Sequence, residues 1–154
     1  MTFRIEWQQT GKNGFTFIDA VLNPPARHRT ELTRAIRGAF INNFANEGVD
    51  RKWPSLAPTT IRDRVRKGFG SGPILVRTGK YKQSFTDMGK GYSRYTRTAT
   101  GWELNVGSTH QHSEIHEFGY GRIPARPAAM ASIRDQSTID SAFYNFLAYA
   151  EKKR

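Results

Sequence analysis

Cysteine is missing from this chain of 154 residues, which excludes a disulfide framework and a thiolate metal site. Long apolar runs are missing too: nowhere do about 18 apolar residues follow one another, so we expect no membrane-spanning helix. The first residues, MTFRIEWQQTGKNG, lack the apolar core of a signal peptide. Acidic residues are few, since 13 Asp and Glu stand against 24 Lys and Arg and give a formal net charge of +11.

The sequence motifs of enzymes and cofactor sites are also missing. The sequence has no G-x-S-x-G motif. Its glycine-rich segment GFGSGP, at residues 68–73, lacks the Lys-Ser or Lys-Thr of a phosphate-binding loop. His112 and His116 would share a helical face, but Ser113 stands where the zinc motif H-E-x-x-H has its glutamate. We therefore expect no catalytic residue, no metal site and no cofactor; an enzyme would have to depend on residues such as Glu114, His116 or Glu117.

The apolar pattern predicts one α+β domain over residues 1–154. Alternation in FRIEW, the turn TGKNG and the following FTFI predict a hairpin within residues 1–20. A second hairpin is expected over residues 92–108, where every second side chain from residue 102 to 106 is apolar. With a short apolar run at residues 74–76, these segments predict an antiparallel sheet of about four to five strands.

A long amphipathic helix is expected within residues 24–48. Its apolar stripe recurs every four residues, at Leu32, Ile36, Phe40 and Phe44. Arg34 and Arg37 fall away from the centre of the stripe, so we expect both to be solvated. The cations at residues 27–29 oppose the helix dipole, and we therefore expect the helix to begin nearer Thr30.

Three further helices are expected. One covers residues 59–67, directly after a proline at a helix-start position. Thr78 is expected to cap a second, short helix that carries Tyr81 and Phe85. The third is the C-terminal helix, over residues 138–152, and it is expected to pack with the long helix against the sheet.

The positive charge predicts an acidic partner. Nucleic acid is one candidate. Tyr92, Tyr95 and Trp102 lie among arginines, and in proteins that bind single strands such aromatic side chains stack on the bases. The alternation around Trp102 favours instead a place for that side chain in the core. A basic nucleic-acid-binding module is the alternative function, and complementarity to an acidic protein surface explains the same charge.

The segment HEFGYGRIPARP, residues 116–127, is stiff for its length. Its two glycines permit positive φ angles, while Pro124 and Pro127 fix the backbone on either side of Arg126. An arginine held in this way suits a bidentate bond to a carboxylate. Two interpretations stay open: a bond that stabilises a loop or an adjoining subunit, and a buttress inside one subunit.

Five segments, taken in order, resemble the phage virion morphogenesis proteins, a family that includes tail completion proteins of contractile-tailed phages. The segments are WPSLAPTT (53–60), ILVRTGKYKQSF (74–85), VGS (106–108), IHEFG (115–119) and IPARP (123–127). The chain departs from the family pattern at three places. It has His112 and Ser113 where Tyr-Ala is usual, residues 128–130 where a bulky apolar residue is usual, and a hairpin at residues 1–20 that looks added.

The resemblance implies a structural and non-catalytic role. Such proteins form rings, commonly hexamers, in the neck or at the head-proximal end of the tail, and they complete the tail and join it to a DNA-filled head. The expected partners are copies of the chain, other tail or head-connector proteins and passing DNA, but no membrane. The expected location is the virion, after assembly in the host cytoplasm. We expect the assembly contacts at Trp53, Leu56, Thr78, Gly79, His116, Phe118, Gly119, Pro124, Arg126 and Pro127.

Overall fold

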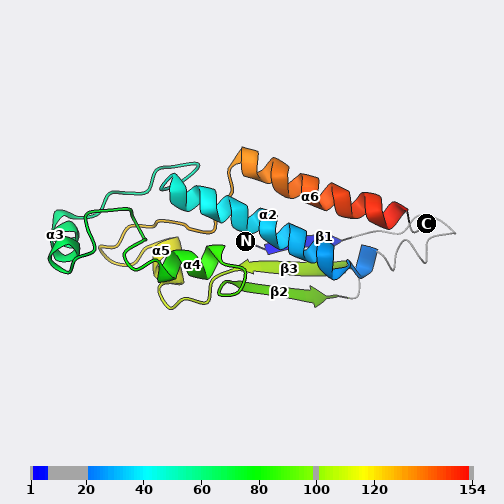
Figure 1. The fold of residues 1–154 in the computed structure, drawn as a ribbon, viewed down its shortest axis with the longest axis horizontal. Helices are drawn as coiled ribbons and strands as arrows, with labels where there is room; N and C mark the ends of the chain where they lie inside the picture. The colour runs from blue at the N-terminus through cyan, green and yellow to red at the C-terminus, as the bar shows by residue number, and fades with distance from the viewer. Residues whose placement is uncertain (1, 7–20, 99–100, 153–154) are drawn as a thin grey trace.

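The computed structural model describes residues 2–6, 21–98 and 101–152. Its elements are β1 (Thr2–Glu6), α2 (Ala26–Ala45), α3 (Pro58–Arg66), α4 (Lys80–Thr86), β2 (Tyr92–Arg97), β3 (Gly101–Gly107), α5 (Ser113–Phe118) and α6 (Ile133–Glu151). The molecule is elongated, with α3 at one end, α4 and α5 between α3 and the sheet, and the sheet toward the other end (Figure 1). The predicted α+β class, the long helix and the C-terminal helix are confirmed.

The sheet of the described residues has three antiparallel strands in the order β1-β3-β2, so the prediction of four to five strands is wrong for this part of the chain. The first strand of the predicted N-terminal hairpin is β1, and the second, at residues 15–18, lies outside the described residues. The apolar run at residues 74–76 forms no strand. The amide of Ile74 donates to Glu47 Oε1 at 2.7 Å, and Leu75 has a φ of 60°, which ends any extended backbone there.

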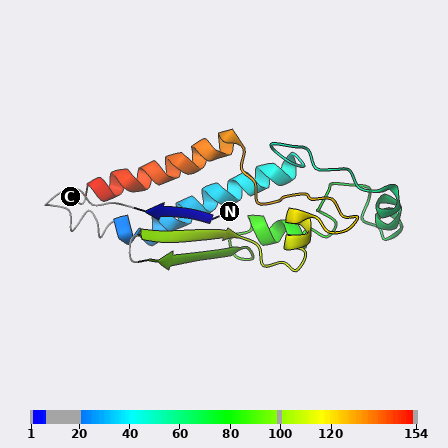
Figure 2. The ribbon, with the colours of Figure 1, turned by 180° about the vertical axis from the view of Figure 1, so that it is seen from behind.

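The second predicted hairpin is confirmed as β2 and β3. Its alternating residues Trp102, Leu104 and Val106 are all buried, and Tyr95 lies opposite Leu104 on the same face. Helices α2 and α6 run side by side along the sheet, as both views show (Figures 1 and 2). Phe146 of α6 joins the two layers, because its ring centroid lies 6.0 Å from that of Trp102.

The apolar stripe of α2 is buried as predicted, but the helix begins at Ala26 rather than near Thr30. Aromatic contacts explain the earlier start. The guanidinium carbon of Arg27 lies 4.5 Å from the centre of the Tyr149 ring, and that of Arg29 lies 4.6 Å from the centre of Tyr95. These cation–π contacts oppose the unfavourable dipole interaction at the helix start.

Arg37 is buried, with 2% of its surface exposed, so the prediction that it is solvated is wrong; Arg34 is exposed as expected. The Arg37 guanidinium donates to the carbonyl oxygens of Phe85 and, at 3.0 Å, Tyr92. Burial lowers its pKa from the usual value, and the charge of Asp87 opposes this effect. Arg37 therefore joins α2 to the end of α4 and the start of β2.

Helix α6 begins earlier than the predicted start at residue 138. A capping box fixes the start: the Ser132 hydroxyl accepts from the Asp135 amide, and the Asp135 carboxylate accepts from the Ser132 amide. The other oxygen of Asp135 accepts from Asn42 Nδ2 at 2.6 Å, so the same residue joins α6 to α2.

Of the shorter helices, α3 and α4 follow the predictions except at one cap, and α5 was not predicted. Helix α4 carries Tyr81 and Phe85 into the core, but Gly79 is its N-cap residue, with a φ of 76° and no capping bond from a side chain. Thr78 is exposed and does not cap the helix, because the left-handed backbone at Gly79 places the helix start one residue later. None of the helices within the described residues is long and apolar enough to cross a bilayer.

Candidate functional site

Residues 116–129, here called the strap, begin in the last turn of α5 and lead toward α6. A backbone bond of 2.6 Å from the Arg126 amide to the His116 carbonyl closes the strap into a loop. Gly119 permits this closure. It has a φ of 77°, and a Cβ there would lie 3.0 Å from the Ala125 nitrogen and from the Ile123 carbonyl oxygen. The predicted need for glycine at this position therefore has a steric cause.

Arg126 fixes the strap to the segment before α3. Only 5% of the residue is exposed, and its Nε and Nη2 donate to the carbonyl oxygens of Pro54 at 2.8 Å and Ser55 at 2.9 Å. Burial lowers the pKa of the guanidinium from its usual value. Both partners are backbone carbonyls of the same chain, which is the arrangement of a buttress inside one subunit.

Two more side chains bind the strap at Pro127. Trp53 Nε1 donates to the Pro127 carbonyl at 3.2 Å, and Asn43 Nδ2 donates to the same oxygen at 2.9 Å. The Trp53 ring is buried and packs edge-on against Phe44, with a centroid distance of 5.5 Å. The strap is thus joined to α2 as well as to the segment before α3.

Glu117 is a strap residue whose role the sequence analysis missed. Its Oε1 accepts from the amides of Ala128 and Ala129 at 2.7 and 3.0 Å. A carboxylate in a short helix is usually solvated, so nothing in the local pattern indicated this bond. The bond returns the end of the strap to α5.

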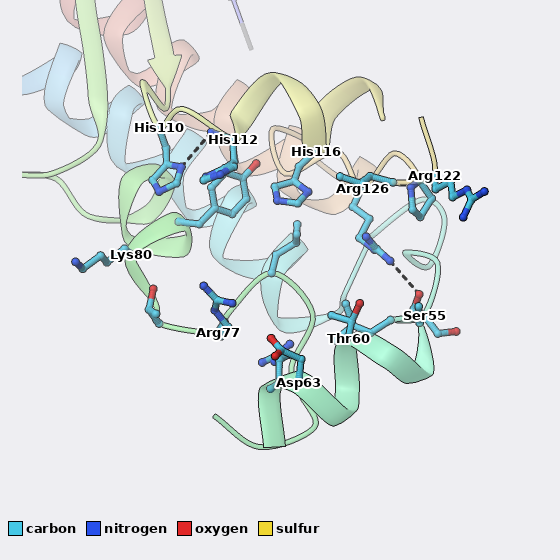
Figure 3. Close-up of a pocket in the computed structure, with 18 of the residues that line it drawn as sticks. Ser55, Thr60, Asp63, Arg77, Lys80, His110, His112, His116, Arg122 and Arg126 are labelled. Carbon is cyan, nitrogen blue, oxygen red and sulfur yellow. Dashed lines mark hydrogen bonds between the residues drawn. The ribbon is translucent and has the colours of Figure 1, made fainter. Parts of the chain in front are cut away.

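An open cleft of about 710 Å³ lies beside the strap. Helices α3 and α4, the segment before α5 and the strap all contribute to its walls. Figure 3 shows His110, His112 and His116 along one side of the cleft and Thr60 and Asp63 of α3 on the opposite side. The basic side chains that line it are Arg64, Arg77, Lys80, Arg122 and Arg126.

One of these cations, Arg64, is buried with 4% exposure, which the sequence analysis did not predict. Its Nη1 and Nη2 donate to the carbonyls of Pro73 at 3.1 Å and Gly72 at 3.3 Å, at the end of the glycine-rich loop. Asp63 is the carboxylate in the lining, and it binds Arg66 at 2.7 Å and Lys67 at 2.9 Å. The bonds to these two cations lower the pKa of Asp63.

The three histidines lie near one another. The ring centroids of His110 and His112 are 5.2 Å apart, and those of His112 and His116 are 6.5 Å apart. His116 also packs on the buried ring of Tyr81 at 5.1 Å. Burial lowers the pKa of His116, and the charge of Arg126 lowers it further. Burial likewise lowers the pKa of His110.

The structure brings the predicted assembly residues into one region. Phe118, Gly119 and Pro127 lie in the strap and do not line the cleft. Gly79 does not line it either but lies between two lining residues, Thr78 and Lys80. Trp53 binds the strap, as described above. The remaining five line the cleft: Leu56, Thr78, His116, Pro124 and Arg126.

The aromatic residues of the second hairpin form no platform for bases. Trp102 is 1% exposed, and Tyr95 packs on the core and donates its hydroxyl to the Leu22 carbonyl at 3.1 Å. Tyr92 is exposed on the opposite face of the strand from Tyr95. Among the described residues, no group of three or more metal-binding side chains is placed to hold a metal ion.

Compared with family models, with curated proteins and with solved structures, the chain matches none. The likeness to the virion morphogenesis proteins therefore stays a prediction that depends on the five sequence segments.

Proposed function

We propose that this protein is a structural, non-catalytic virion subunit that completes a phage tail and joins it to the DNA-filled head. It acts as a ring of copies of itself, with a hexamer as the expected number, at the neck or at the head-proximal end of the tail. It assembles in the host cytoplasm and binds other tail or head-connector proteins.

The observation that supports this proposal most is the convergence of the five segments that carry the resemblance. Arg126 of the fifth segment binds Pro54 and Ser55 of the first, and its amide binds His116 of the fourth. The ring of Tyr81, in the second segment, packs on His116. Ser108, in the third, lies 2.7 Å from Ser84 in the second, measured between the two hydroxyl oxygens. Residues that look like one family pattern therefore also form one body in space.

Exposed apolar side chains on the strap support a role in protein contacts. Phe118 is 81% exposed and Tyr120 is 75% exposed, although the strap that carries them is fixed by hydrogen bonds from the buried side chains of Arg126 and Trp53. Large apolar side chains on a rigid segment lose little entropy when a partner covers them. This is the surface we assign to contacts between neighbouring copies.

Electron microscopy of the purified protein, alone and on particles, tests the proposal. We expect closed rings of uniform size in the isolated protein and density for the ring between head and tail. When particles are assembled without the protein, separate heads and tails should accumulate. Normal joined particles without the protein would contradict the proposal.

The alternative, a basic nucleic-acid-binding module, is favoured by the net charge of +11 and by the exposed positions of Tyr92 and Arg94 on β2. A salt titration separates the two functions. Tight duplex binding by the monomer, with a steep loss of affinity as salt rises, would favour the module. Ring formation without such binding favours the structural role.

A further inference from the structure

We propose that the cleft beside the strap is a docking site for an acidic segment of a different protein. The side chains that line the cleft support this site on their own, whether or not the protein belongs to a phage particle.

The charges that line the cleft are mostly positive. Among the described residues, five cationic side chains and three histidines line the cleft, against the single carboxylate of Asp63. That carboxylate is already bound to Arg66 and Lys67, so it does not offset the lining cations. Arg77, Lys80 and Arg122 are exposed. The lining therefore favours a ligand that carries negative charge.

The two buried arginines carry the second step, since they are fixed before any ligand arrives. Arg64 and Arg126 each donate two hydrogen bonds to backbone carbonyls. In Arg126 the donors of these two bonds are Nε and Nη2, so Nη1 takes part in neither of them. Guanidinium groups held in this way lose little side-chain entropy when they bind a carboxylate.

The rest of the lining favours a peptide over a nucleic acid. Leu56, Leu75 and Ile123 line the cleft beside the cations, and such side chains suit the apolar neighbours of an acidic residue. Tyr81 is the aromatic residue of Phe, Tyr or Trp type in the lining, and it is 8% exposed with its ring packed on Phe85. A single strand would need a free aromatic face on which to stack its bases.

The occupant is a different protein rather than a second copy. The 13 acidic residues of this chain nowhere lie closer than three positions apart, so the chain contains no acidic run that could follow the cleft.

Binding of a labelled, glutamate-rich peptide, followed by fluorescence anisotropy near physiological salt, tests the proposal. The peptide alternates glutamate with leucine or alanine, and its glutamine counterpart is the peptide control. The cleft variant changes the exposed cations Arg77, Lys80 and Arg122 to Gln. The matched variant removes the same charge elsewhere by changing Arg34 of α2, Arg134 of α6 and Lys152, the C-cap residue of α6, to Gln. A single-stranded DNA of equal charge forms the other arm of the experiment.

We expect the glutamate peptide, but not its glutamine counterpart, to bind the intact chain. Affinity should fall at least about tenfold in the cleft variant and by less than about twofold in the matched variant. Both variants should keep the circular dichroism and melting temperature of the intact chain, since all six side chains are exposed. Equal losses in the two variants, no peptide binding at all, or DNA binding that is tighter and lost only in the cleft variant would each overturn the proposal.

Discussion

At the scale of single residues, Arg126 decides between two interpretations of the strap. Its guanidinium is buried and donates to the carbonyls of Pro54 and Ser55, so Arg126→Ala removes two hydrogen bonds and the packing of a buried side chain. We expect the free energy of unfolding of the monomer to fall by about 2–4 kcal/mol, measured by urea denaturation. Arg126→Lys should lose less, because an ammonium group can still donate to one of the carbonyls.

The subunit-contact interpretation makes the opposite prediction for the same variant. An Arg126→Ala monomer as stable as the original, combined with complete loss of assembly, would show that the side chain acts between copies rather than as a buttress.

His116 should make the stability of the fold depend on pH. Burial and the nearby Arg126 lower its pKa in the folded chain, and the positive charges of His112 and His110 act in the same direction. The unfolded chain then binds the proton more tightly, so stability is fully present above the ordinary histidine pKa of about 6.5 and is lost as pH falls below it. We expect the melting temperature to fall between about pH 7.5 and 5.5, and His116→Gln to flatten that dependence. His110 contributes to the remainder. An unchanged pH dependence in His116→Gln would exclude this role.

At the scale of elements, Arg37 connects α2, α4 and β2. Arg37→Met keeps the apolar stem but leaves the carbonyls of Phe85 and Tyr92 without their donor. We expect a loss of roughly 1–3 kcal/mol in the free energy of unfolding. Arg34→Met on the same helix is the matched control. Because Arg34 is exposed, its replacement should change stability by less than about 0.5 kcal/mol. Equal effects of the two substitutions would mean that the guanidinium of Arg37 does not join the three elements.

The elements that could be predicted from the sequence are those whose burial is periodic. Leu32 to Phe44 indicated the long helix, and Trp102 to Val106 indicated the central strand, because packing on one face imposes the period of the backbone. The early start of α6 could not be found in that way, since it depends on Ser132 and Asp135 and on the distant Asn42. The loop at residues 74–76 is apolar because Ile74 reaches the core, and apolar character alone does not distinguish a buried loop from a strand.

The same reasoning explains which site residues were found. Gly119 and Arg126 could be found because local residue types indicate them: glycine permits a positive φ, and prolines on either side of an arginine restrict its backbone. Arg64 and Glu117 were missed because their partners are backbone groups brought near only by the fold. The residues that line the cleft come from positions 55 to 126, and no local sequence pattern indicates that they lie close together in the fold.

At the scale of the whole molecule, the basic charge and the exposed strap have different consequences. The cleft cations lie toward one end of the elongated shape, between α3 and the region of α4, α5 and the strap (Figure 1). Phe118 and Tyr120 project from the same region. A subunit built in this way can contact copies of itself through apolar side chains while its cations bind a partner of opposite charge.

Sedimentation of the strap variant tests the central claim most directly. Replacing Phe118 and Tyr120 by Ser removes the exposed apolar pair, and replacing Ile133 and Tyr144 of α6 by Ser removes a comparably exposed pair elsewhere. We predict that the intact chain and the α6 variant sediment as one closed oligomer, while the strap variant sediments as a folded monomer. An intact chain that stays monomeric at every concentration, or an oligomer that survives loss of the strap pair, would contradict the account.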